Sequence, residues 1–342
     1  MKGLGKKVVA LAAVATMAMT ALTGCAESSF DSKEIIATVD DTKITAGVAN
    51  FYLRYQQCEV EAIYKQMVGE NLWITTVDET TGDTYADLVK KDAMESLVEM
   101  YIAKAHMDEY DVTISKEEKE AISKSAEAFV KANDKEALAK VSGEKKIVEE
   151  LLELNTIYSK VKAAVTKEAD REVSDEEAAL KKMTYVKFAT STTSDDGTTT
   201  ELSDGKIKEL KKEAQDVLEN AKAAGDLLTY AETTEHQGTE LSFNAESTAI
   251  ATEAIKAADA LGEGEFAELI EAEDGFYVIQ VTSLLDREAT DANKKDILQK
   301  EKDDFYTKVY EAWKEEVKVD IKDKVLDKID FQALEITTPA QG

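Results

Sequence analysis

The sequence predicts an α+β protein, in which long helices dominate and a smaller antiparallel sheet forms a separate part of the chain. Three observations predict this class. The 342 residues include one proline and 15 glycines, so few positions break a helix. Several long stretches repeat apolar residues at helical spacing. Two stretches in the second half, 183–190 and 276–281, have the period of two that is typical of strands.

The charge of the chain limits its partners. Asp and Glu number 70 and Lys and Arg 42, which gives a net charge of -28. No basic surplus exists to neutralise phosphates, so we expect no nucleic-acid partner. An anionic membrane is not bound by charge alone either. The length suits two or three domains.

The N-terminus has the pattern of an export signal. Three lysines among the first seven residues precede the apolar run Val8–Leu22, which has the length of a signal-peptide core. The sequence Leu22-Thr23-Gly24-Cys25 follows and resembles the bacterial lipobox. We therefore expect a signal peptide over residues 1–24, lipidation of Cys25 and a lipid anchor on the outer face of a bacterial cell membrane. Residues 25–34 are predicted to be the tether.

The remaining cysteine and the two histidines indicate no catalytic or metal centre. With Cys25 lipidated, Cys58 has no partner for a disulfide, and its helical apolar surroundings predict a small buried side chain. His106 and His236 are far apart in the sequence and have no cluster of Cys or carboxylate residues around them. We expect neither a metal nor a cofactor.

The first half of the ordered chain is predicted to be mostly helical. A strand, a turn and a second short strand fill 35–45, and a helix follows over 46–67. Residues 71–84 have the composition of a loop, and 85–109 of a second helix. Further helices are predicted over 115–165. The first of them opens with Ser-x-x-Glu at Ser115, the pattern of a capping box.

The strands of the second half have defined faces. In 183–190, Val186 and Phe188 share one face, and Tyr185 and Lys187 share the other. A tight turn is predicted at Asp274-Gly275, because glycine adopts positive φ at little cost. In the strand that follows, the residues of one face are Phe276, Val278 and Gln280, and those of the other are Tyr277, Ile279 and Val281.

Between and after these strands the sequence alternates polar and helical segments. A polar loop is predicted over 191–205, an amphipathic helix over 206–224 and a short helix over 250–261. A long charged helix is predicted from Arg287 to about Glu316, and a short alternating strand over 317–321.

The stretch Leu261–Asp286 resembles the last strands of a parvulin-type (PpiC-like) peptidyl-prolyl isomerase. The family pattern is Leu-x-x-Gly-Glu, then Gly-aromatic-His-Ile-Ile, and this chain has Gly264-Glu265, then Gly275-Phe276-Tyr277-Val278-Ile279. Residues 183–190 resemble the first strand of that family, Arg-x-His-Ile-Leu-Val. The segment Gly225–Ala231 is similar to its helix start, Gly-x-Asp-Phe-x-x-Leu-Ala.

The resemblance implies a site with substituted residues. Tyr277 stands at one family histidine, and Tyr185, or Lys187 in the alternative register, at the other. Gln237 falls at the family Asp or Cys, although a slip of one residue would put His236 there. The resemblance places the substrate-binding pocket at Phe243, Ile250 and Ala254. Two tyrosines are able to hydrogen-bond each other, since a phenol both donates and accepts.

The segment from Ile35 to Met67 resembles the start of exported foldases of the SurA and PrsA type. In that family a C-terminal helix packs back on the N-terminal helices, so the isomerase domain is an insertion in a helical chaperone body. The resemblance implies the following domains: signal peptide 1–24, tether 25–34, N-terminal helical domain 35–180, parvulin-like domain 181–286, C-terminal helix and strand 287–335, and tail 336–342.

Three functions remain open from the sequence. The first is a membrane-anchored foldase or chaperone that binds unfolded or newly exported client proteins. The second is an active peptidyl-prolyl cis-trans isomerase, which would lower the barrier of roughly 20 kcal/mol to rotation about an X–Pro bond by desolvating the amide. The third is a solute-binding lipoprotein with a cleft between two α/β lobes, which the helix-rich first half disfavours.

Overall fold

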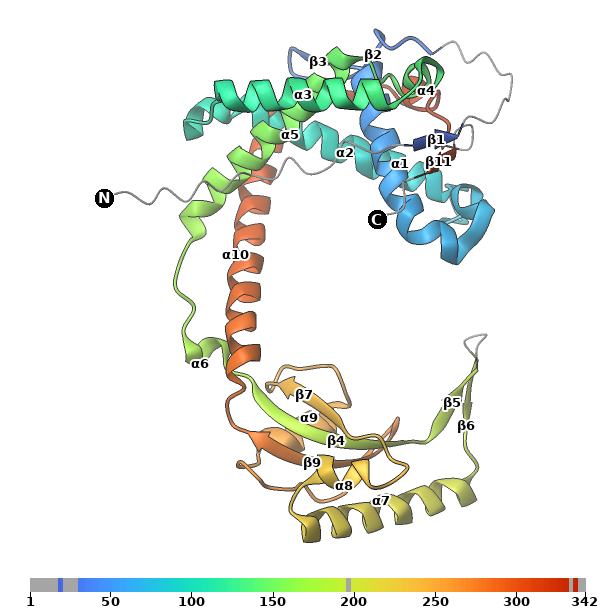
Figure 1. Cartoon of the computed structure of the whole chain (residues 1–342), viewed down its shortest axis with the longest axis vertical. Coiled ribbons are helices and arrows are strands. Elements are labelled where there is room, and N and C mark those ends of the chain that lie inside the picture. The colour runs from blue at the N-terminus through green and yellow to red at the C-terminus, as the bar shows by residue number, and fades with distance from the viewer. Residues whose placement is uncertain (1–17, 21–29, 195–197, 332–334, 338–342) are drawn as a thin grey trace. The chain divides into compact units, whose positions relative to one another are not determined.

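The computed structural model describes residues 18–20, 30–194, 198–331 and 335–337 (Figure 1). The chain divides into two compact units. The first, which we call the body unit, comprises residues 1–169 and 303–342, and the second, the sheet unit, comprises residues 170–302. Helices dominate the body unit and an antiparallel sheet lies at the centre of the other, so the predicted α+β class is confirmed.

The body unit begins with a small sheet and continues with helices. Its elements are β1 (Ala18–Thr20), β2 (Ile35–Val39), β3 (Thr42–Thr45), α1 (Ala46–Val68), the 3-10 helix η1 (Gly69–Ile74), α2 (Tyr85–Ala105), η2 (Met107–Tyr110), α3 (Lys116–Ala132), α4 (Lys135–Val141), α5 (Lys145–Thr166), η3 (Lys167–Ala169), the last part of α10 (Arg287–Glu316), β10 (Val319–Ile321), α11 (Asp323–Leu326) and β11 (Glu335–Thr337).

Segments from the N-terminal and the C-terminal parts of the chain share the core of the body unit. β10 pairs with β2, and β2 with β3, in an antiparallel sheet of order β10-β2-β3. The C-terminal side chains Trp313, Val325 and Phe331 are buried in the same cluster as α1, α2, α3 and α5. Residues more than 250 positions apart in sequence therefore stabilise one core.

The helix boundaries follow local signals in the sequence. The predicted capping box at Ser115 forms: the Glu118 amide donates to Ser115 Oγ at 3.1 Å, and the Ser115 amide to Glu118 Oε2 at 2.7 Å. A second capping box joins Thr84 and Asp87 at the start of α2. The expected helix 85–109 ends at Ala105, where His106 stops the α-helix and η2 follows. Residues 69–74, partly expected as loop, form η1.

Cys58 and His106 occupy structural positions. Cys58 is buried as predicted, and burial raises the pKa of its thiol to about 11, which makes it a poor nucleophile. The His106 ring stacks on the Trp313 ring with centroids 4.3 Å apart, and its Nδ1 lies 2.8 Å from Glu109 Oε1. The histidine thus helps to join α10 to η2.

The sheet unit surrounds one four-stranded sheet. Its elements are α6 (Asp175–Ala178), β4 (Lys181–Ala189), β5 (Ser191–Thr193), β6 (Thr199–Glu201), α7 (Asp204–Ala224), α8 (Leu227–Glu232), β7 (Thr239–Phe243), α9 (Thr252–Asp259), β8 (Ile270–Ala272), β9 (Gly275–Ser283) and the first part of α10.

Two hydrophobic clusters cover the two faces of this sheet, whose order is β7-β4-β9-β8. On one face Val186, Phe188, Phe276 and Val278 pack against α7 and α8. On the other, Met183, Tyr277, Ile279 and Val281 pack against α9. The faces predicted for the two strands are confirmed.

One expected loop is wrong. Residues 191–205 contain the hairpin β5–β6, in which Thr192 pairs with Thr200. Threonine is β-branched and favours extended backbone, so polarity alone gave the wrong prediction here.

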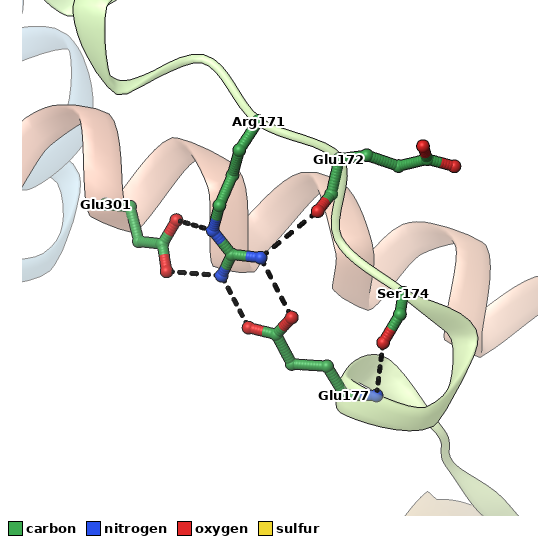
Figure 2. A network of polar contacts seen from close by, with 5 residues as sticks. All are labelled: Arg171, Glu172, Ser174, Glu177 and Glu301. Atoms are coloured by element: carbon green, nitrogen blue, oxygen red, sulfur yellow. Dashed lines mark hydrogen bonds and ion pairs between the residues drawn. The ribbon is translucent and has the colours of Figure 1, made fainter.

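A polar network holds the entry segment of the sheet unit on α10 (Figure 2). The Arg171 guanidinium donates to Glu301 through Nε at 2.8 Å and Nη2 at 2.5 Å. It also donates to Glu177 through Nη1 at 2.9 Å and Nη2 at 2.5 Å. Two bidentate pairs on one guanidinium fix its geometry more firmly than a single contact would.

The predicted signal peptide and Cys25 lie almost entirely outside the described residues. Within that region only Ala18–Thr20 is described, as β1, which pairs antiparallel with β11. In the described part of the chain, no helix has both the length and the apolar character needed to cross a membrane.

Candidate functional site

Tyr185 and Tyr277, the two residues expected at the family histidines, lie side by side. They come from β4 and β9, neighbouring strands of the sheet, and both point to the α9 face. Their ring centroids are 6.1 Å apart and the ring planes are inclined by 46°. The sheet therefore brings together two of the three residues predicted as catalytic.

The hydroxyl of Tyr277 has a partner other than Tyr185, although two tyrosines are able to hydrogen-bond each other. Tyr277 donates its hydroxyl to Asp274 Oδ2, at 2.8 Å. Strand register explains the difference: Tyr277 lies directly opposite Lys187, while Tyr185 lies opposite Ile279 and is diagonal to Tyr277. The carboxylate of the nearby turn is the acceptor instead.

Lys187, the residue of the alternative register, completes this arrangement. Its Nζ donates to Asp274 Oδ2 at 2.5 Å and lies 5.5 Å from the centroid of the Tyr277 ring. Lys187, Asp274 and Tyr277 thus form one connected set, which we call the Asp274 network. A cation over an aromatic face adds to the ion pair.

The electrostatics of the Asp274 network favour its charged form. Partial burial acts to raise the pKa of Asp274, but the hydrogen bonds from Lys187 and Tyr277 outweigh it and hold that pKa below its usual value. Burial acts to lower the pKa of Lys187, but the bond to Asp274 outweighs it and the pKa is raised. Burial, followed by the bond to Asp274, raises the pKa of Tyr277. At neutral pH the set is a carboxylate, an ammonium and a neutral phenol.

The predicted turn positions Asp274. β8 and β9 form a hairpin, with Glu273 and Asp274 at the turn and Gly275 opening β9. Gly275 has a φ of 148°, and a Cβ there would meet the Phe188 carbonyl oxygen at 2.3 Å. Glycine is needed here because β4 passes too close for any side chain.

Gln237, the third predicted catalytic residue, lies apart from this set. It is exposed in the connection between α8 and β7. Among the hydrogen bonds and ring contacts of the described residues, none joins Gln237 to Tyr185 or Tyr277. Its role stays a prediction.

The alternative that placed His236 in the site is wrong. The His236 ring packs on Phe188, with centroids 4.8 Å apart, and its Nε2 lies 3.4 Å from Glu213 Oε1 on α7. Phe188 belongs to the α7 and α8 face of the sheet, whereas Tyr277 belongs to the α9 face. The sheet itself separates His236 from the tyrosines.

The predicted substrate-binding residues share one cluster with the tyrosines. Phe243, Ile250 and Ala254 pack with Tyr185 and Tyr277 under α9. Phe243 and Ala254 have 0% exposure, so in this structure they are core residues without surface for a client. Ile250 is half-buried.

The side chains around Tyr277 differ from those that an isomerase site requires. An isomerase site needs an open apolar pocket and groups that stabilise a twisted amide. Here the Tyr277 hydroxyl donates to Asp274 and the Tyr277 side chain is fully buried. Phe243 and Ala254, in the same cluster, are fully buried too. The chemistry of the site is that of a closed structural network.

Asp274 is the residue of this network that sequence reasoning missed. It was read only as a turn former. Its spacing of three residues from Tyr277 is the signal that the sequence offers, whereas the register that places Lys187 opposite Tyr277 is seen only in the folded sheet.

A second surface feature stands out in the body unit. Exposed large apolar side chains occur on α1, η1, the loop after η1 and the start of α2, and α1 and α2 both pack against η1. We call this set the apolar end. Its members, with their exposed fractions, are Ile63 (61%), Tyr64 (42%), Ile74 (49%), Val77 (46%) and Leu88 (42%).

The apolar end rests on an ordered scaffold. Trp73 stacks on Tyr85 at 5.8 Å between centroids, and its Nε1 donates to Glu61 Oε1 at 2.9 Å. The loop after η1 is closed by a β-bridge between Thr76 and Thr84. These ring contacts and backbone bonds hold the segments that carry the exposed side chains. Sequence periodicity gave no sign of them, since exposure there depends on how η1 packs.

In the described part of the chain, no group of three or more His, Cys, Asp or Glu side chains is placed to hold a metal ion.

No protein-family model matches this chain, and no curated protein matches it. Among solved structures, the chain is similar to a SurA-like chaperone of Campylobacter jejuni, with 10% identity and a TM-score of 0.30, over 84% of this chain and 99% of that one. It is similar to the foldase protein PrsA from Lactococcus lactis, with 17% identity and a TM-score of 0.33, over 88% and 100%. It is also similar to PrsA from Streptococcus pneumoniae, with 19% identity and a TM-score of 0.30, over 75% and 99%.

These three solved structures are a SurA-like chaperone and two PrsA foldases. At these TM-scores the likeness assigns no activity, which has to rest on the residues of this chain.

Proposed function

We propose that this protein is an exported chaperone that binds unfolded segments of newly exported client proteins at the apolar end. The observation that supports the proposal is the exposure of five large apolar side chains on elements of one unit that pack against one another, namely Ile63, Tyr64, Ile74, Val77 and Leu88. Exposed apolar side chains that cluster in this way mark an interaction surface.

The physical basis is burial of client side chains. Unfolded chains expose apolar residues that would otherwise associate with one another. Covering them removes apolar surface from water, which contributes about 25 cal/mol per Å² and is opposed by the entropy lost on association. The net charge of -28 keeps the chaperone and its complexes apart in solution.

Suppression of aggregation tests this proposal. A soluble form beginning at residue 26 is mixed with a chemically unfolded client, and light scattering is followed on dilution. We expect slower aggregation, and loss of most of this effect in Ile63→Ser/Ile74→Ser. The matched control is Leu284→Ser/Leu285→Ser, which removes two exposed leucines from the sheet unit. If the unmodified protein neither binds the client nor slows its aggregation, the proposal fails.

We propose further that the parvulin-like domain is not a working isomerase. The proposal is supported by the committed Tyr277 hydroxyl and by the buried positions of Phe243 and Ala254. A proline-peptide assay should give no rate above that of buffer, for the unmodified protein and for Tyr277→Phe alike. A measurable rate that Tyr277→Phe abolishes would restore the isomerase function.

We propose that Cys25 carries a lipid that holds the protein on the outer face of a bacterial membrane. The support is the run of basic, apolar and lipobox residues that precedes it. Labelling cells with a fatty-acid analogue should mark the unmodified protein and leave Cys25→Ser unlabelled. Label retained by Cys25→Ser would contradict this assignment, and Cys58→Ser is the control because Cys58 is buried.

A further inference from the structure

The stretch from Asn71 to Val89, which carries three residues of the apolar end, is acidic, whereas on α1 Lys65 directly follows Tyr64. Between Asn71 and Val89 there is no Lys or Arg, and the four carboxylate residues are Asp78, Glu79, Asp83 and Asp87. Ile74, Val77 and Leu88 belong to the same stretch. All four carboxylate residues are exposed.

The loop between Thr76 and Thr84 holds apolar and acidic residues close together. The Val77 amide donates to the Asp83 carbonyl at 2.9 Å, so these two residues face each other across the loop. Asp78 Oδ1 accepts from the amides of Thr80 at 2.7 Å and Thr81 at 3.3 Å. These bonds fix the loop and lower the pKa of Asp78, so its charge is kept beside Val77.

We call Asp78, Glu79, Asp83 and Asp87 the rim, and two lysines follow it on α2. Lys90 is almost buried and forms an ion pair with Asp87 at 3.1 Å. Lys91 is exposed one residue further along α2. Glu79 and Asp83 therefore add their charge to the rim of the apolar end.

We propose that the apolar end selects apolar polypeptide segments that are flanked by lysine or arginine. The proposal rests on the proposed chaperone function and names its preferred client. The apolar residues bind the hydrophobic part of the segment, and the carboxylates attract basic flanks and repel acidic ones. Client segments bounded by glutamate or aspartate are rejected by like charge.

Three labelled peptides test the selectivity on the purified protein. They share one ten-residue apolar sequence and differ only in two lysines, two serines or two glutamates at each end. Fluorescence anisotropy should show the lysine peptide bound roughly tenfold more tightly than the glutamate peptide at low salt, with serine between them. High salt should narrow this ratio, since the rim is exposed to solvent.

A charge-neutral variant assigns the effect to the rim. In Glu79→Gln/Asp83→Asn we expect the lysine peptide to lose about threefold in affinity and the glutamate peptide to gain. The control Glu232→Gln/Glu235→Gln removes the same charge from exposed positions of the sheet unit and should change neither. Circular dichroism checks that both variants fold.

The outcomes separate this inference from the function on which it rests. Equal affinity for the three peptides, or equal effects of the two double variants, would overturn the selectivity and leave the chaperone function standing. If no peptide binds and client aggregation is not slowed, both fail together.

Discussion

At the scale of single residues, Asp274 decides what the tyrosine pair is able to do. It accepts hydrogen bonds from Lys187 Nζ and from the Tyr277 hydroxyl. These two bonds occupy the Tyr277 hydroxyl and join three parts of the sheet unit: the turn at Asp274, β4 through Lys187 and β9 through Tyr277.

The pKa of Asp274 predicts how acid affects this link. That pKa is lowered in the folded protein, so the contribution of Asp274 to stability is complete above its unfolded value of 3.8 and is lost as the pH falls through the folded value. Comparing the unmodified protein with Asp274→Asn, we expect faster amide hydrogen exchange of β4 and β9 in the variant at neutral pH. This difference should shrink as the pH falls below 3.8 and vanish once the pH is below the pKa of Asp274 in the folded protein.

A control variant tests whether the faster exchange in Asp274→Asn is specific to the sheet unit. Asp78 also has a lowered pKa, but it lies in a loop of the body unit, so Asp78→Asn should leave exchange in β4 and β9 unchanged. A difference between Asp274→Asn and the unmodified protein that persists undiminished at low pH would contradict the assignment.

At the scale of elements, local patterns predicted most of what the structure shows. Alternation gave the faces of β4 and β9, helical spacing gave α1, and the long helix from Arg287 to Glu316 has the predicted bounds. The register between β4 and β9 could not be predicted in the same way, because a strand's own sequence does not determine which partner residue lies opposite. That register put Lys187, and not Tyr185, opposite Tyr277.

Gly275 offers a test at this scale. We expect Gly275→Ala to destabilise the sheet unit by at least about 2 kcal/mol, because its φ is strained for alanine and a Cβ would clash with the β4 backbone. Gly264 also has positive φ, at 81°, but a Cβ there meets nothing within 4 Å, so Gly264→Ala should cost only about 1 kcal/mol. Urea unfolding, with hydrogen exchange of the β9 amides as the readout, measures the loss of stability in each of the two variants. Equal losses would show that the close approach of β4 contributes nothing.

At the scale of the whole molecule, the chain passes between the two units twice, at 169–170 and at 302–303. On the side of the sheet unit the two passages are joined: Lys302 pairs with Asp170 at 2.7 Å, and Arg171 pairs with Glu301. The sequence indicated neither these pairs nor the apolar end, since both depend on segments that meet only in the folded chain. It did indicate that one part of the chain is inserted in another, through the resemblance to exported foldases.

Loss of the Arg171 contacts should therefore increase local opening of the segment that follows the first crossing, at 169–170. In Arg171→Met, Glu177 and Glu301 lose the guanidinium that lies between them, and the two carboxylates repel each other (Figure 2). We expect a glutamate-specific protease to cut after Glu172 several times faster, since the entry segment then opens more often. Mass spectrometry of the first fragments measures the rate. Lys212→Met, which removes a surface ion pair within α7, is the control and should leave that rate unchanged. Cleavage requires the backbone to open locally. An unaltered rate in Arg171→Met would therefore contradict the prediction and mean that packing of the entry segment, and not its ion pairs, keeps this backbone ordered.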